Sequence, residues 1–161
     1  MPYLQLYYHV VWATKHRKPL ITPKIETKTH EFLRAKAIGL GGTVYALNGI
    51  VDHIHMVVSV PPKLAVATFV GQVKGVASSK INKLRLTEEP FAWQEEYGAF
   101  TFDRKRLQNF VAYVQNQKQH HSQNTAIAAL ERDIEADAHI HEQSEIYALE
   151  EADWRNEMIQ I

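Results

Sequence analysis

The chain contains no cysteine, which excludes disulfide bonds and thiolate metal sites and leaves the redox compartment undetermined. It also has no apolar run approaching the roughly 20 residues of a membrane span, and no basic segment followed by an apolar stretch at its start. We therefore expect a soluble, cytoplasmic protein without a membrane partner. The 161 residues, 45% of them hydrophobic, suit one domain or one domain with an extension.

Net charge is also absent, but the charges are distributed unevenly along the chain. Residues 1–118 contain 16 Lys and Arg against 8 Asp and Glu, whereas residues 119–161 contain 2 against 10. A basic body with an acidic tail indicates an anionic polymer as partner, with nucleic acid first. The alternatives are solvated charged faces and a tail that is only a soluble appendage.

The hydrophobic pattern predicts an α+β fold of the ferredoxin-like (RRM-like) split βαβ type, an antiparallel sheet with two helices on one face. A further helix follows, and residues 124–161 are expected to form acidic helices that pack on the body or on a partner subunit. We expect two units, a domain at 1–122 and an extension at 123–161. The predicted strands are 3–14, 43–51, 53–60 and 92–102, and the predicted helices are 23–40, 64–86 and 105–120.

The strand predicted at 53–60 contains His53-Ile54-His55. Side chains two residues apart on a strand share one face, so the two imidazoles stand side by side while Ile54 points into the core. Such a pair can bind a metal ion, although two core or surface histidines are the common alternative. His139-Ile140-His141 has the same spacing, but in a predicted helix its rings diverge by about 200° and cannot easily share one ion.

The helix predicted at 105–120 follows a capping candidate, Asp103, and contains Tyr113 and Gln117. Residues four apart on a helix are neighbours, so a phenol and a carboxamide face the same direction. Taken alone, such a pair is most often a packing pair.

Four segments taken together resemble the single-tyrosine HUH transposases of small bacterial and archaeal insertion sequences, the IS200-like family. They occur in order over residues 3–121. Each segment is weakly specific alone, whereas four in order at matching separations are specific. The segments are YHVVWATK (8–15), VDHIHMVV (51–58), VGQVKGVASS (70–79) and YVQNQKQHH (113–121).

This resemblance implies a DNA transposase that cleaves and rejoins single-stranded DNA without ATP, through a 5′-phosphotyrosine formed by Tyr113. It assigns His53, His55 and Gln117 as metal ligands. It also implies a homodimer that acts on hairpin ends and whose active sites are completed in cis or in trans. The sequence departs from the family in lacking a serine near Phe100–Asp103, and Asn116-Gln117 favours the dimeric branch over repeat-processing relatives that show Asn-Pro.

The predicted chemistry suits these residue types. Two imidazoles and an amide oxygen leave Mg²⁺ or Mn²⁺ its full charge with which to neutralise a phosphodiester. A phenol with a pKa of about 10 needs help to act as a nucleophile. Asp52 should face away from the histidines and support them indirectly. The candidate DNA contacts, each equally open to plain solvation, are His9, Lys15, Arg17, Lys18, Lys74 and Lys80.

Three other functions stay open from the sequence. A domesticated relative that processes repeats would use the same residues. A non-catalytic module that binds single-stranded nucleic acid would leave the histidine and Tyr/Gln pairs unexplained. A metal-dependent phosphoesterase that activates water would need no tyrosine.

Overall fold

A computed structural model of the chain describes residues 2–133. Its four strands form one antiparallel sheet in the order β2-β3-β1-β4, so the strand that carries both histidines lies inside the sheet rather than at an edge. The α+β prediction with an antiparallel sheet is confirmed. The strands are β1 (Tyr7–Ala13), β2 (Thr43–Ile50), β3 (His53–Ser59) and β4 (Gly98–Phe102).

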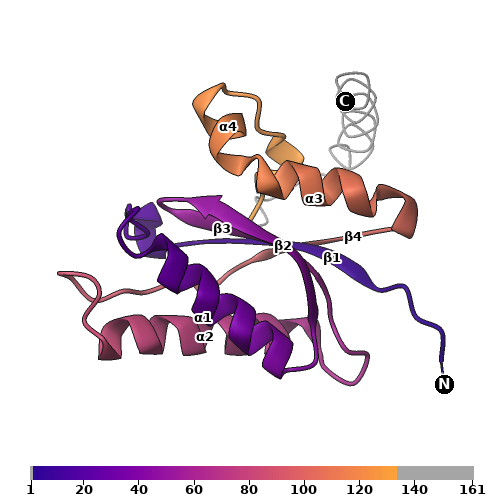
Figure 1. The fold of residues 1–161 in the computed structure, drawn as a ribbon, viewed down its shortest axis with the longest axis horizontal. Helices are drawn as coiled ribbons and strands as arrows, with labels where there is room; N and C mark the ends of the chain where they lie inside the picture. Colours follow the sequence, from indigo (N-terminus) through magenta and orange to yellow (C-terminus); the bar gives the residue numbers. More distant parts are fainter. Residues whose placement is uncertain (1, 134–161) are drawn as a thin grey trace.

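Helices cover both faces of this sheet (Figure 1). The helices α1 (Glu26–Gly39) and α2 (Val66–Lys83) pack side by side on one face, as the split βαβ pattern predicts. The helices α3 (Leu107–Gln115) and α4 (Gln117–Ser122) lie over the other face. Three 3₁₀ turns complete the described part: η1 (Lys15–Arg17), η2 (Arg104–Arg106) and η3 (Ala128–Glu131).

The alternation of side chains along the strands divides the interior into two cores. Val10, Trp12 and Ile54 belong to the larger core under α1 and α2. The smaller core, under α3, is closed by Ile127 and Leu130 from the segment around η3. Ile127 and Leu130, which come from the start of the predicted extension, therefore pack on the body. His139, His141 and the other residues of the acidic tail beyond 133 lie outside the described residues.

Two strands begin several residues later than predicted. β1 begins at Tyr7 rather than Tyr3, because its partners β3 and β4 end opposite Tyr7 at Ser59 and Phe102. β4 begins at Gly98 rather than Ala92, because the carbonyl groups of residues 94–96 accept hydrogen bonds from the Lys74 ammonium and leave the sheet.

The helix predicted at 105–120 is divided at Asn116 into α3 and α4. Asn48 at the end of β2 donates to the Gln115 carbonyl at the end of α3, at 2.9 Å. Asp103 is a cap, as predicted, but it caps η2 by accepting from the Arg106 amide. Within residues 2–133, no helix is long and apolar enough to cross a membrane.

Candidate metal centre and nucleophile

His53 and His55 lie side by side on the α3 face of β3, with ring centroids 5.1 Å apart. His53 pairs with Ala13 and Ile50, and His55 pairs with Val11 and Asn48, so neighbouring strands hold both backbones. Both rings are buried, and Ile54 between them is buried in the opposite core. The geometry that the strand spacing predicts for the histidine pair is confirmed.

Two neighbours fix the orientation of these rings. Asp52 Oδ1 lies 2.7 Å from His53 Nδ1, and His9 Nε2 lies 2.7 Å from His55 Nδ1. Both Nε2 atoms therefore point away from these partners and toward α3 and η3. Burial lowers the pKa of His53, but hydrogen bonds to Asp52 and Glu131 outweigh that effect and raise it to about 9. Burial dominates at His55 and lowers its pKa, which favours the neutral ring that metal binding requires.

Tyr113 projects from α3 toward the histidines, with its ring centroid 6.0 Å from that of His55. Its hydroxyl donates to Glu131 Oε1 at 2.5 Å and accepts from the Ile127 amide at 2.9 Å. Burial and then the Glu131 charge raise the pKa of this phenol. Tyr113 is only 1% exposed, so α3 and the segment around η3 enclose its side chain.

Gln117 lies one turn beyond Tyr113, at the start of α4, and is fully buried. Its Nε2 donates to the Tyr113 carbonyl at 3.4 Å, and its Oε1 lies 3.2 Å from His121 Nε2. The Lys118 ammonium fixes this turn by donating hydrogen bonds to the Asn48 side chain, the Gly49 carbonyl and the Glu26 carboxylate. Gln117 therefore keeps the face shared with Tyr113 even though the helix is interrupted between them.

Two further side chains enter the site that the sequence did not indicate. Glu131 Oε2 lies 2.8 Å from His55 Nε2 and 3.1 Å from His53 Nε2. His121 Nε2 lies 3.1 Å from His53 Nε2. Burial raises the pKa of Glu131, but hydrogen bonds from His53 and His55 outweigh it and hold the pKa well below its usual range.

These side chains form a cluster that could hold a metal ion. His53, His55, His121 and Glu131 each offer a ligand atom, and the four atoms lie within 4.8 Å of one another. The i, i+4 spacing from Gln117 could have indicated His121 from the sequence. No motif marks Glu131, which reaches the site from 76 residues after His55.

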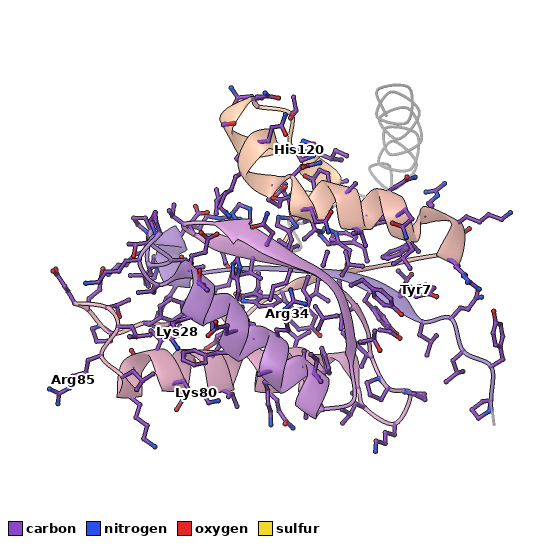
Figure 2. The ribbon with its side chains drawn as sticks, in the orientation of Figure 1. Tyr7, Lys28, Arg34, Lys80, Arg85 and His120 are labelled. Atoms are coloured by element: carbon purple, nitrogen blue, oxygen red, sulfur yellow. The ribbon has the colours of Figure 1, made fainter. Side chains whose placement is uncertain are left out.

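The predicted DNA contacts fall into three groups. Lys15, Arg17 and Lys18 are exposed on and beside η1, next to the end of β3 that carries the histidines. There the Arg17 guanidinium forms an ion pair with Asp133 at 2.9 Å and lies 3.8 Å from the Asp52 carboxylate. Lys80 is exposed on α2, across the sheet from His120 on α4 (Figure 2). It lies 5.4 Å from the centre of the Phe32 ring.

The other two candidates require a correction. His9 is fully buried, with its ring stacked on His55 at 4.9 Å. Lys74 is 6% exposed, and its ammonium donates to the carbonyl groups of residues 94–96. Neither side chain can contact DNA from these positions. His9 orients a site histidine, and Lys74 holds the segment that leads to β4.

Comparison with known proteins agrees with this arrangement. Residues 2–117 match the family described as Transposase IS200 like. The chain is 25% identical over 118 residues to the ISDra2 transposase TnpA of Deinococcus radiodurans, covering 70% of this chain and 84% of that protein.

Two solved structures share the fold. A crystal structure from Deinococcus radiodurans, provisionally described as a transposase, has a TM-score of 0.59 at 23% identity, covering 72% of this chain and 93% of that one. A REP-associated tyrosine transposase bound to a REP hairpin has a TM-score of 0.58 at 10% identity, covering 75% and 72%. Because the family match extends over most of the chain and the fold agrees, this protein belongs to the IS200-like transposase family, whose members cleave and rejoin DNA.

Proposed function

We propose that the protein cleaves and rejoins single-stranded DNA, with Tyr113 as the nucleophile and His53, His55 and Gln117 as ligands of a divalent ion. The proposal rests on the position of the Tyr113 hydroxyl next to the imidazole rings of His53 and His55. One carboxylate, that of Glu131, contacts the hydroxyl at 2.5 Å and His55 Nε2 at 2.8 Å. A nucleophile and a candidate metal site therefore share one buried space.

The reaction proposed for Tyr113 is a reversible exchange of phosphate esters. The phenol oxygen attacks the phosphorus, a bond from phosphorus to that oxygen forms, and the bond from phosphorus to the 3′ oxygen breaks. The proton lost by the phenol is balanced by the proton gained at the free 3′-hydroxyl. Attack by a 3′-hydroxyl on the phosphotyrosine reverses these changes and joins strands, so the energy of the broken bond is retained without ATP.

The residues fit a divalent ion because both histidines direct Nε2 into the space under Tyr113, and their Nδ1 atoms are occupied by Asp52 and His9. When bound, Mg²⁺ or Mn²⁺ would neutralise and orient the phosphate oxygens. The residues of the chain orient the ligands and the nucleophile. Asp52 and His9 hold the rings, and α3 presents the phenol.

The basic turn at η1 is the proposed DNA contact surface nearest the site. Lys15, Arg17 and Lys18 are exposed there, and phosphate contacts by such residues give sequence-independent affinity that falls with salt. The hairpin bound by the structurally similar REP-associated transposase supports a hairpin as ligand. We also propose a homodimer. Because one chain places Tyr113 beside its own His55, the arrangement described here supports active sites completed in cis.

The deciding experiment incubates the purified protein with labelled single strands that carry the DNA flanking its own gene, with Mn²⁺. We expect an SDS-resistant protein–DNA adduct that Tyr113→Phe abolishes while DNA binding survives. Tyr45→Phe, at a partly exposed tyrosine on β2, is the matched control and should retain the adduct. An adduct formed by Tyr113→Phe would refute the nucleophile assignment.

Two further variants test the remaining parts of the proposal. His55→Ala should lose cleavage, and EDTA should have the same effect on the unmodified protein. Undiminished cleavage in EDTA would exclude the metal role. A mixture of Tyr113→Phe and His55→Ala subunits should stay inactive if the sites are completed in cis, whereas restored cleavage would show completion in trans.

A further inference from the structure

Glu131 occupies the centre of the site rather than its edge. Its Oε2 atom lies 2.8 Å from His55 Nε2, 3.1 Å from His53 Nε2 and 3.4 Å from His121 Nε2. His53 Nε2 and His121 Nε2 are themselves 3.1 Å apart. Four potential ligand atoms, from β3, α4 and η3, therefore converge on one point, although only His53 and His55 belong to the HUH motif.

The distances are those expected around a shared cation. Ligand atoms bonded at about 2.1 Å with angles between 90° and 109° lie about 3.0–3.4 Å from one another. Hydrogen bonds alone do not account for the cluster, because one carboxylate oxygen offers two lone pairs and here faces three imidazole nitrogens. Asp52 and His9 already occupy the Nδ1 atoms of His53 and His55, so both rings can present only Nε2.

Resting on the metal site of the proposed function, we propose that Glu131 is itself a ligand of the divalent ion, with His121 as a further nitrogen ligand. Three imidazoles and a carboxylate suit Mn²⁺ or another transition ion better than Mg²⁺, which favours oxygen ligands. Gln117 Oε1 lies 3.2 Å from His121 Nε2, so Gln117 stays beside this cluster as the oxygen ligand of the proposed function.

The second oxygen of Glu131 gives the residue a positioning role. Oε1 accepts from the Tyr113 hydroxyl at 2.5 Å, and the Ile127 amide four residues earlier donates to the same hydroxyl at 2.9 Å. One short segment therefore holds the nucleophile and a ligand of the ion together. Leu130, which is buried in the core under α3, anchors that segment next to Glu131.

Mn²⁺ affinity, measured by electron paramagnetic resonance on the full chain without DNA, tests this inference independently of activity. Glu131→Gln keeps an acceptor for the Tyr113 hydroxyl but removes the charge, and we expect at least a tenfold weaker affinity. Glu88→Gln, at an exposed glutamate in the loop after α2, is the matched control and should bind Mn²⁺ as the unmodified protein does. Affinity within twofold of the unmodified protein for Glu131→Gln would overturn the inference.

A second pair of variants covers the case in which Glu131→Gln does not fold. His121→Asn should also lose at least tenfold in Mn²⁺ affinity. Its control is His16→Asn, at an exposed residue whose positive φ of 57° asparagine tolerates. Unchanged affinity in His121→Asn would remove His121 from the ligand set.

The failure of this inference and that of the proposed function are distinguishable. Loss of Mn²⁺ binding in His55→Ala but not in Glu131→Gln or His121→Asn would leave the histidine pair as a metal site and refute the Glu131 assignment. An adduct retained by Tyr113→Phe would refute the proposed nucleophile, whatever the Mn²⁺ affinities are.

Discussion

Gly98 at the start of β4 offers a sharp test of how the η3 segment is held. A Cβ atom at this position would overlap the backbone carbonyl oxygen of Arg132 and would lie 3.0 Å from Val11 Cγ1. The obstacle is backbone rather than the end of a flexible side chain, so Gly98→Ala must push the segment that carries Glu131 away from the sheet. Strain of this kind costs about 1–3 kcal/mol.

Amide hydrogen exchange measures this displacement directly. The Ile127 amide donates to the Tyr113 hydroxyl, and the Leu130 amide donates to the Ile127 carbonyl at 2.9 Å, so both should be protected in the unmodified protein. Weakening the segment by about 1–3 kcal/mol should speed exchange of both amides by about 5- to 160-fold. Amides in the centre of β1 and β3 should keep their protection.

The matched control is Gly71→Ala, at an exposed position in α2 where a Cβ would meet nothing within 4 Å. Alanine in a helix interior should stabilise the protein by about 0.5–1 kcal/mol and leave exchange at Ile127 unchanged. Unaltered exchange at Ile127 and Leu130 in Gly98→Ala would refute the close approach of the segment to β4, and with it the reason for placing Glu131 in the site.

The remaining predictions concern Lys74, Asp52 and the metal. Burial lowers the pKa of Lys74 to about 8, from a usual value of 10.5, so between these values the folded state loses this proton while the unfolded state keeps it. In urea titrations, the difference in free energy of unfolding between the unmodified protein and Lys74→Met should therefore rise by up to about 3 kcal/mol from pH 8 to 10.5. A difference that stays constant or falls over this range would contradict the prediction. Asp52→Asn should weaken Mn²⁺ binding by about 10- to 100-fold, measured by electron paramagnetic resonance, because Asp52 orients the His53 ring. Unchanged binding would show that the His53 ring keeps its orientation without Asp52. Adding Mn²⁺ to the EDTA-treated protein at 100 times its dissociation constant should stabilise the fold by about 2.7 kcal/mol, seen as a higher melting temperature, and no shift would indicate that the folded state does not bind the ion.

The local pattern of residues was sufficient to predict the fold and half of the site. Alternation along β3 predicted that Ile54 faces the core, because the two-residue repeat of a strand leaves little choice once one face is buried. The same repeat placed His53 and His55 together. The helical spacing of Tyr113 and Gln117 predicted their common face, which persists through the interruption at Asn116.

Other features depend on contacts between distant segments, which no local pattern encodes. His9 and Lys74 looked like available polar groups, but pairing of β1 with β3 places His9 on His55, and the turn of residues 94–96 encloses Lys74. The sequence by itself thus determined the split βαβ fold, the histidine pair and the face shared by Tyr113 and Gln117. Only the tertiary structure decided that Glu131 joins them, because packing of Ile127 and Leu130 under α3, rather than any short-range periodicity, brings that carboxylate to the site.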